Sequence, residues 1–435
     1  MGQQYWIILT SDKVAGELLQ KRGGKYSTRI PSYYLYNILT RGKSYVSCPY
    51  NERYKMLTPI IHGILDQRNI KKNSKLLDDE FRILMKNLCK ASTTEKDGFY
   101  PKYYFHLASL NIITLLCLNK RTESVDDLFY TEFEDLMGKR FDLVKATNRL
   151  SEFFPILKLF PNNNLYNNLV ENRENVEALY RKSIKDVIDD KEEKPCVVRD
   201  LLHKKDEGIL DELDVIYIMD TLLAGGTDTV SASLTWLTAT LANNPQIQSK
   251  AHHELDRVIG QSRLPEVSDE QNLPYIRAII KEGQRYCGPI YLGIPHGTEE
   301  DDEYNGYHIP ANSVVILNQY GIHMDEKRYE NPKEFKPERF LEFTESSATL
   351  AKGNYEHRDH FGFGAGRRLC SGIHMARISR LLWCFRIENT SPLPINLDKV
   401  RTGITIWPEE YHVRLVKRHD NVEKTVTPVI LNATL

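Results

Sequence analysis

The chain has only seven cysteines in 435 residues, and they form no closely spaced pairs and no C-x-x-C motif. A disulfide framework and a structural zinc site both depend on such pairs. The spacing therefore argues against both and indicates a reducing compartment. The cysteines are at positions 48, 89, 117, 196, 287, 370 and 384.

A membrane-spanning run and an excess of charge are also missing. No stretch of about 18 apolar residues is present, and the N-terminus has no signal-peptide pattern. The net charge of −1 gives no electrostatic basis for binding nucleic acid. With 41% hydrophobic and 27% charged residues, the composition is that of a globular chain with a large core.

One cysteine lies in a glycine-rich loop, FGAGRRLCSG at residues 363–372, just before an apolar helix expected to begin near Ser371. Glycines at 364 and 366 permit conformations closed to other residues, so the loop can wrap the sulfur and point amide N–H groups at it. The positive end of the helix is expected to lower the pKa of the Cys370 thiol. The pattern favours a metal-ligating thiolate over the commoner buried structural cysteine. Arg368 is placed to pair with an anionic group of the molecule bound there.

The longest predicted helix covers about residues 212–244 and contains the sequence AGGTDT at 224–229. Two adjacent glycines, Gly225 and Gly226, each cost about 1 kcal/mol relative to alanine. We expect a local break there that lets a planar cofactor approach, with Asp228 and Thr229 as the acid and alcohol of a proton relay. The alternative is a softened helix in which Thr229 bonds back to its own backbone.

Weaker patterns complete the prediction. Glu282 and Arg285 share a helix face, and they form either a trivial surface pair or a buried network with Arg339. Residues 5–9 predict a strand, and residues 304–310 with 314–317 predict a hairpin.

Taken in this order, the glycine-containing helix, Glu282 to Arg285, Pro337 to Phe340 and the Cys370 loop resemble the cytochrome P-450 family of heme-thiolate monooxygenases. The likeness is closest to eukaryotic, fungal microsomal members and covers almost the whole chain. It implies a mainly α fold with small β-sheets, formed by residues 1–435 as a single domain. The membrane anchor, hinge and first strand of a microsomal member are expected to be missing from this chain.

The resemblance also implies roles for particular residues. Cys370 would be the axial ligand of the iron of heme b. The remaining heme-binding residues would be Phe363, Gly364, Arg368, Gly372, His296, Gly225 and Gly226, with Arg368 and His296 at the propionates. Asp228 and Thr229 would deliver protons to dioxygen, and Glu282, Arg285 and Arg339 would form a structural ion network. Arg367 and Arg377 would face an acidic electron donor.

One departure from the family pattern concerns the heme propionates. The family usually has a tryptophan followed four residues later by arginine in an early helix, where this chain has Tyr54 and Thr58. A weaker hold on heme is expected, with Lys55 or His62 as candidates to compensate.

The expected reaction is insertion of one oxygen atom from O2 into a small apolar organic substrate. Electrons would come from NADPH through a cytochrome reductase, with cytochrome b5 as a further candidate donor. The protein is expected to be a monomer. A full-length family member would lie on the cytosolic face of the endoplasmic reticulum membrane, and this chain alone is expected to be soluble or peripheral. One alternative is a heme-binding protein or a truncated product without activity. The other is a heme-thiolate isomerase or dehydratase, and the presence of the Asp228-Thr229 pair argues against this second alternative.

Overall fold

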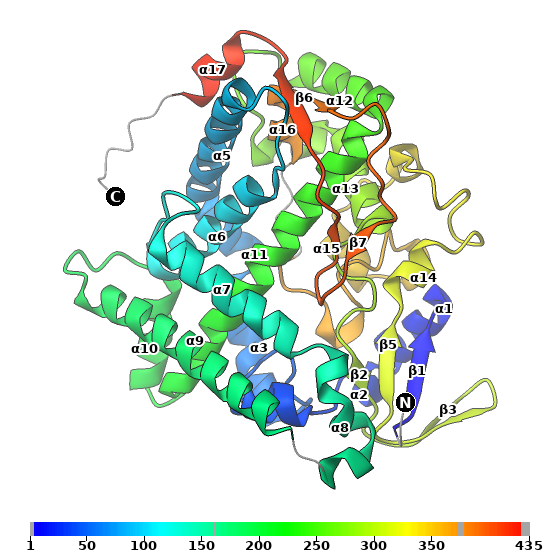
Figure 1. The fold of residues 1–435 in the computed structure, drawn as a ribbon. Coiled ribbons are helices and arrows are strands. Elements are labelled where there is room, and N and C mark those ends of the chain that lie inside the picture. The colour runs from blue at the N-terminus through cyan, green and yellow to red at the C-terminus, as the bar shows by residue number, and fades with distance from the viewer. Residues whose placement is uncertain (1–3, 160–161, 373–377, 428–435) are drawn as a thin grey trace.

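The longest helix, α11 (Glu212–Ala242), runs through the middle of the molecule, as Figure 1 shows. It begins at a capping box, in which the Asp211 carboxylate accepts a hydrogen bond from the Asp214 amide and the Asp214 carboxylate accepts one from the Asp211 amide. It ends before Pro245, which opens the next helix. The predicted helix is therefore confirmed within two residues of its expected end. The computed structural model describes residues 4–159, 162–372 and 378–427.

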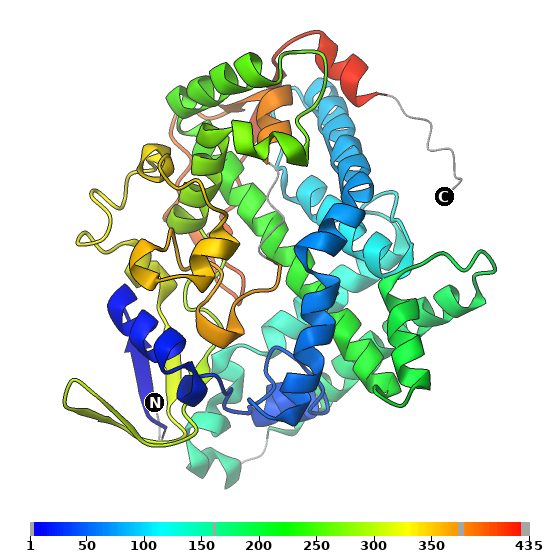
Figure 2. The same ribbon diagram turned by 180° about the vertical axis from the view of Figure 1, so that it is seen from behind.

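Helices cover α11 along most of its length (Figures 1 and 2). The helix α6 (Lys102–Leu118) packs against it and is buried on nearly every face, which explains its almost uninterrupted apolar sequence. The helix α7 (Leu128–Leu143) crosses α11 on the side facing the viewer in Figure 1. Two helices that follow one another in the sequence thus meet the much later α11 at the centre.

A small three-stranded sheet lies beside the helices. Its middle strand β5 (Val314–Leu317) pairs in parallel with β1 (Trp6–Leu9) and antiparallel with β2 (His296–Gly297). The predicted strand at 5–9 is confirmed, but the predicted hairpin is wrong in its second half. The hairpin joins β3 (Asp302–Tyr304) to β4 (Tyr307–Ile309), whereas all four residues of β5 are buried and suit the middle of a sheet.

The described residues thus form a mainly helical domain with small sheets, as predicted. The other helices are α1 (Asp12–Ala15), α2 (Gly23–Tyr26), α3 (Glu52–Ile64), α4 (Gln67–Lys72), α5 (Ser74–Thr94), α8 (Leu150–Phe153), α9 (Asn163–Asp189), α10 (Val197–Asp206), α12 (Pro245–Val258), α13 (Pro274–Tyr286), α14 (Gln319–His323), α15 (Ser347–Lys352), α16 (Ile378–Cys384) and α17 (Asn421–Val426). The other strands are β6 (Phe385–Asn389), β7 (Val400–Arg401), β8 (Trp407–Pro408) and β9 (Val413–Lys417).

Candidate functional site

The Cys370 loop is shaped by two glycines in the left-handed region, Gly364 at φ 79° and Gly366 at φ 67°. The Cys370 amide donates to the carbonyl of Phe363 at 2.9 Å, which closes the loop. The backbone N–H of Gly372 interacts with the sulfur and favours its charged form. The loop therefore presents one sulfur with a backbone donor on it, as the glycine spacing predicts.

The Cys370 residue is accessible, although its sulfur is closely surrounded by protein atoms. Cys370 is exposed, whereas the other six cysteines are buried. Even so, burial among protein atoms raises the pKa of the Cys370 thiol, and this effect outweighs the amide of Gly372. The expected lowering of the thiol pKa is therefore wrong. Residues 373–377, within the helix expected to begin near Ser371, lie outside the described residues, and the helix α16 is described from Ile378.

The middle of α11 also has an open face. Gly225 is exposed although it is half-way along the central helix, and a Cβ added there would meet nothing within 4 Å. Gly226 faces the other way, where an added Cβ would lie 2.8 Å from Cδ1 of Ile113 on α6. The two glycines thus serve different surfaces, with Gly226 allowing α6 to approach closely.

The predicted break in α11 is absent. The helix is continuous from 212 to 242, and the Thr229 hydroxyl donates to the carbonyl of Gly225 at 2.6 Å. A threonine hydroxyl that donates to the carbonyl four residues earlier leaves the backbone hydrogen bonds of the helix in place. The alternative weighed for this segment is the one observed.

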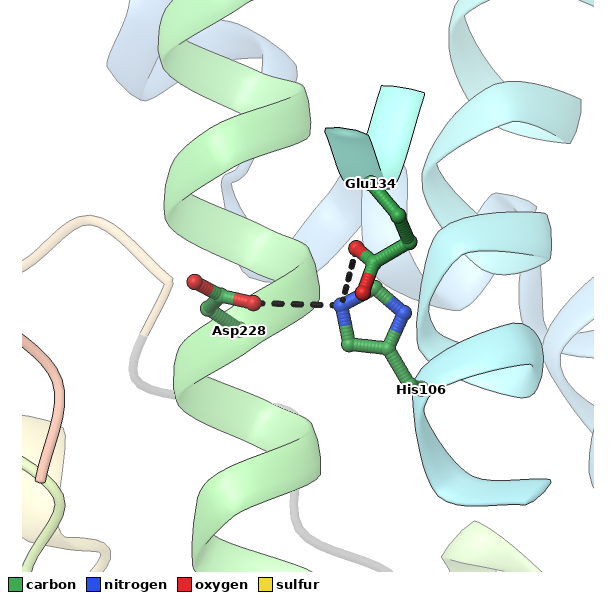
Figure 3. Close-up of side chains that lie close together, drawn as sticks. All are labelled: His106, Glu134 and Asp228. Carbon is green, nitrogen blue, oxygen red and sulfur yellow. Dashed lines mark hydrogen bonds and ion pairs between the residues drawn. The ribbon is translucent and has the colours of Figure 1, made fainter. Parts of the chain in front are cut away.

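Asp228 does not contact the Thr229 hydroxyl. Its carboxylate lies 3.1 Å from Nε2 of His106 on α6, and the same nitrogen lies 3.1 Å from a carboxylate oxygen of Glu134 on α7 (Figure 3). Sequence reasoning missed His106 and Glu134, because neither belongs to a motif. The three residues are brought together only by the crossing of three helices.

Three basic side chains gather near the Cys370 loop. Arg368 donates to the carbonyls of Ser27 and Cys48, at 2.7 and 2.6 Å. Arg29 donates to two backbone carbonyls near His296, and its Nε is buried without a partner. Burial, followed by the neighbouring charge of Arg368, lowers the pKa of Arg29 to about 9. Among the described residues no carboxylate forms an ion pair with either arginine, so the site holds uncompensated positive charge.

His296 belongs to the same group. Its Nδ1 lies 2.8 Å from the carbonyl of Tyr26. Burial, and next the charge of Arg29, lowers the pKa of His296 well below its usual value. The structure thus places the predicted Arg368 and His296 with Arg29, which sequence reasoning missed because it lies in no recognised pattern.

Tyr54 and Thr58, the two positions on α3 that differ from the usual family pattern, make contacts with defined partners. Tyr54 stacks on Tyr45 with ring centroids 5.1 Å apart, and the Arg368 guanidinium lies 3.6 Å from the Tyr54 ring centroid. Thr58 bonds back to its own helix. Lys55 is turned to Glu52 at 2.7 Å and is half exposed, and His62 is exposed. Tyr54 therefore contacts Arg368, and Arg29 is buried close to the same guanidinium.

Glu282, Arg285 and Arg339 form one buried network. Arg285 donates two hydrogen bonds of 2.7 Å to the Glu282 carboxylate, and Arg339 donates one of 3.1 Å. The side chains of Glu282 and Arg285 are fully buried. The structure therefore selects the buried reading and not the surface pair. Because Arg285 also donates to the carbonyls of His323 and Pro332, the network ties α13 to the loop that carries Arg339.

A sequence model described as Cytochrome P-450 matches residues 1–387. The chain belongs to the cytochrome P-450 family. It is 33% identical over 429 residues to the cytochrome P-450 monooxygenase atE of Aspergillus terreus, covering 91% of this chain and 76% of that one. It is 32% identical to the cytochrome P-450 monooxygenase patI of Aspergillus clavatus, covering 97% and 82%. A zebra fish cytochrome P-450 solved with abiraterone shares the fold, with a TM-score of 0.77 at 23% identity over 95% of this chain and 93% of that one.

Membership of the cytochrome P-450 family identifies the protein as a heme-dependent oxidoreductase of the monooxygenase type, with electrons supplied by a redox partner. The resemblance seen in the motifs is thereby confirmed. No helix in the described ranges is both long enough and apolar enough to cross a membrane.

Proposed function

We propose that this cytochrome P-450 inserts one atom of O2 into a small apolar organic substrate, with electrons from NADPH delivered by a reductase. The observation that carries the proposal is the Cys370 sulfur, which lies in an accessible residue of the glycine-rich loop and has a backbone donor on it. A thiolate is a strong iron ligand, and heme held by cysteine is the form suited to cleaving the O–O bond.

The residues present fit a heme group. Heme carries two propionates, and the buried cluster of Arg29, Arg368 and His296 has positive charge that no carboxylate of the described residues pairs with. The orphaned Nε of Arg29 would gain an acceptor. Cys370 would ligate the iron, with Phe363, Gly364 and Gly372 shaping its loop. The open face of α11 at Gly225 would border the heme.

When bound, heme supplies the redox chemistry that activates O2. The chain's own residues orient the reactants and hold protons. Thr229 offers a hydroxyl on the pocket side of α11, and its bond to the Gly225 carbonyl sets the direction of that hydroxyl. Asp228 lies in the same helical turn as Thr229 and would exchange a proton with the pocket through a change of rotamer. The Glu282 network would help keep the Cys370 loop in place by joining α13 to the segment that carries Arg339.

Apolar surface supports the proposed substrate class. Leu292 and Ile404 expose 53% and 47% of their surface, and their segments are joined by a hydrogen bond of 2.7 Å from the Ile406 amide to the Pro289 carbonyl. Ala224 and Thr221 are partly exposed on α11 beside Gly225. A pocket with these walls would bind its ligand by burial of apolar area.

Two surfaces support the proposed partners and location. Arg367 is exposed next to the Cys370 loop and would face an acidic reductase or cytochrome b5; Arg377 lies outside the described residues. Phe154, Ile156 and Leu159 expose 45–75% of their surface, next to Phe153, whose ring lies 5.7 Å from that of Trp6. Such an apolar strip would rest on a lipid surface, which supports a peripheral place on the endoplasmic reticulum membrane.

The test is the absorption spectrum of the purified protein, reduced and under carbon monoxide. We expect the red-shifted Soret band of thiolate ligation, and we expect Cys370→Ala to lose it. The matched control Cys287→Ala should keep the band, because Cys287 is a buried cysteine at the C-terminal end of α13. A histidine-type spectrum, or an unchanged band in Cys370→Ala, would overturn the proposal. A thiolate spectrum without NADPH oxidation in the presence of a reductase would instead indicate a heme-binding protein without activity.

A further inference from the structure

His106, Glu134 and Asp228 meet where α6, α7 and α11 cross, as Figure 3 shows. A single nitrogen, Nε2 of His106, lies 3.1 Å from one carboxylate oxygen of each acid. Because Nε2 carries at most one hydrogen, the ring cannot donate a separate hydrogen to each acid at the same time. His106 is 1% exposed, so its ring has few alternatives to this pairing.

The charge around this ring is unusual. No lysine or arginine among the described residues forms an ion pair with Glu134 or Asp228. Burial, opposed by His106 and reinforced by Asp228, raises the pKa of the Glu134 carboxyl. The other titratable groups facing the cluster are Tyr130, edge-on to the His106 ring, and the more distant Lys102 and Tyr103. Among the described residues, His106 is therefore the basic side chain that pairs with both acids.

Accessibility differs along the cluster. The Glu134 side chain is 33% exposed, Asp228 is 18% exposed and His106 is 1% exposed. A proton can thus enter at the carboxyl that water reaches most easily and pass through the buried ring. It leaves at the acid on α11, whose sequence neighbour Thr229 lies on the open face of that helix.

We propose that His106 and Glu134 are positioning residues that hold, and after each turnover replace, the proton that Asp228 delivers toward Thr229. The inference rests on the proposed monooxygenase function, in which a proton is needed at the oxygen pocket. In the charged ring, the Nε2–H bond breaks and an O–H bond forms on Asp228 Oδ1, leaving a neutral imidazole and a neutral carboxyl. Glu134 takes a proton from a hydronium ion of the solvent, which leaves as water; the Glu134 O–H bond then breaks, and the N–H bond re-forms on Nε2. One proton moves from the solvent to Asp228, and no electrons are transferred.

A purely structural hydrogen-bond cluster would behave differently. The variant His106→Gln keeps an N–H donor to both acids but cannot carry the extra proton, and Glu134→Gln removes the entry acid. The matched control is Glu132→Gln, which removes the same charge from the exposed face of the same helix. These variants separate loss of the proton from loss of the contact.

The first readout needs no turnover. Histidine side chains labelled with ¹⁵N are titrated by NMR in the reduced holoprotein under carbon monoxide, with His106→Gln assigning the signal. We expect the His106 ring to lose its second proton at lower pH in Glu134→Gln than in Glu132→Gln, because the adjacent negative charge is gone. A ring that stays neutral from pH 5 to 8 in the unmodified protein would overturn the proposal.

The second readout measures hydrogen peroxide released per NADPH oxidised with a cytochrome reductase present. We expect a rise of at least about threefold in His106→Gln and Glu134→Gln, and none in Glu132→Gln. Conversion of cumene hydroperoxide to cumyl alcohol should stay within about twofold, because this reagent arrives with its own proton. An unchanged peroxide yield, an equal loss of cumyl alcohol formation or an effect of EDTA on the unmodified protein would refute the relay. Absence of both the thiolate spectrum and cumyl alcohol formation in the unmodified protein would instead refute the proposed function.

Discussion

Replacing Gly366 by alanine tests how the Cys370 loop is built. A Cβ at this position would lie 1.9 Å from the backbone oxygen of Leu19, in the helical turn Gly16–Lys21. Gly364 offers a matched comparison in the same loop. It has a similar φ of 79°, but its Cβ would lie 3.6 Å from the nearest atom, the Arg368 carbonyl oxygen.

The expected magnitudes follow from this difference. A left-handed conformation costs a non-glycine residue about 1–2 kcal/mol, and both variants bear this cost. In Gly366→Ala the loop and the Leu19 backbone must also separate by about 1 Å, and overpacking of this kind typically costs about 1–3 kcal/mol more. We therefore expect losses of about 1–2 kcal/mol for Gly364→Ala and about 2–5 kcal/mol for Gly366→Ala. The second is a large share of a typical unfolding free energy of about 5–15 kcal/mol.

The assay is urea unfolding of both variants and the unmodified protein, followed by tryptophan fluorescence, with heme content measured in parallel. Gly366→Ala should unfold at the lowest urea concentration and bind the least heme. Equal midpoints for the two variants would show that the backbone contact at Leu19 contributes nothing, and the reasoning from the loop geometry would be refuted.

Three further predictions concern the interior. Glu282→Gln removes the carboxylate that pairs with the fully buried Arg285 and should lower the free energy of unfolding by about 3–5 kcal/mol, measured by urea titration; a loss below about 1 kcal/mol would contradict burial of the pair. Gly225→Ala should stabilise α11 by about 1 kcal/mol, whereas Gly226→Ala should destabilise it by crowding α6. The melting temperature should therefore be higher than that of the unmodified protein in Gly225→Ala and lower in Gly226→Ala, and the reverse order would contradict the packing. Burial lowers the pKa of His360 to about 4, below about 6.5 in the unfolded chain, so the unfolded state binds more protons and stability is lost as pH falls through this window. His360→Asn should reduce that slope by up to about 1.4 kcal/mol per pH unit, and an unchanged slope would exclude this residue as the cause.

The loop around Cys370 could be predicted because its properties are local. Positive φ angles at Gly364 and Gly366 follow from the absence of a side chain, and the order of motifs along the chain was enough to predict the family. The length of α11 followed from its apolar pattern and its terminal proline. The helix break did not occur, since a bond from Thr229 to the backbone satisfies the same sequence without one.

Pairing between distant strands and burial of charge could not be predicted in the same way. Residues 314–317 suited a hairpin as well as a central strand, and only packing against β1 decided between them. Glu282 and Arg285 suited a surface pair as well as a buried one, because the sequence does not say which helix face meets solvent.

The sequence by itself therefore determined the glycine-rich Cys370 loop, the central helix and membership of the cytochrome P-450 family, since each depends on backbone conformation and residue order. Only the tertiary structure decided which charges lie together. It placed Arg29 beside Arg368 and His296, and it placed His106 between Glu134 and Asp228. These contacts join residues up to about 340 positions apart, and their energies depend on shared burial, which only the packed chain defines.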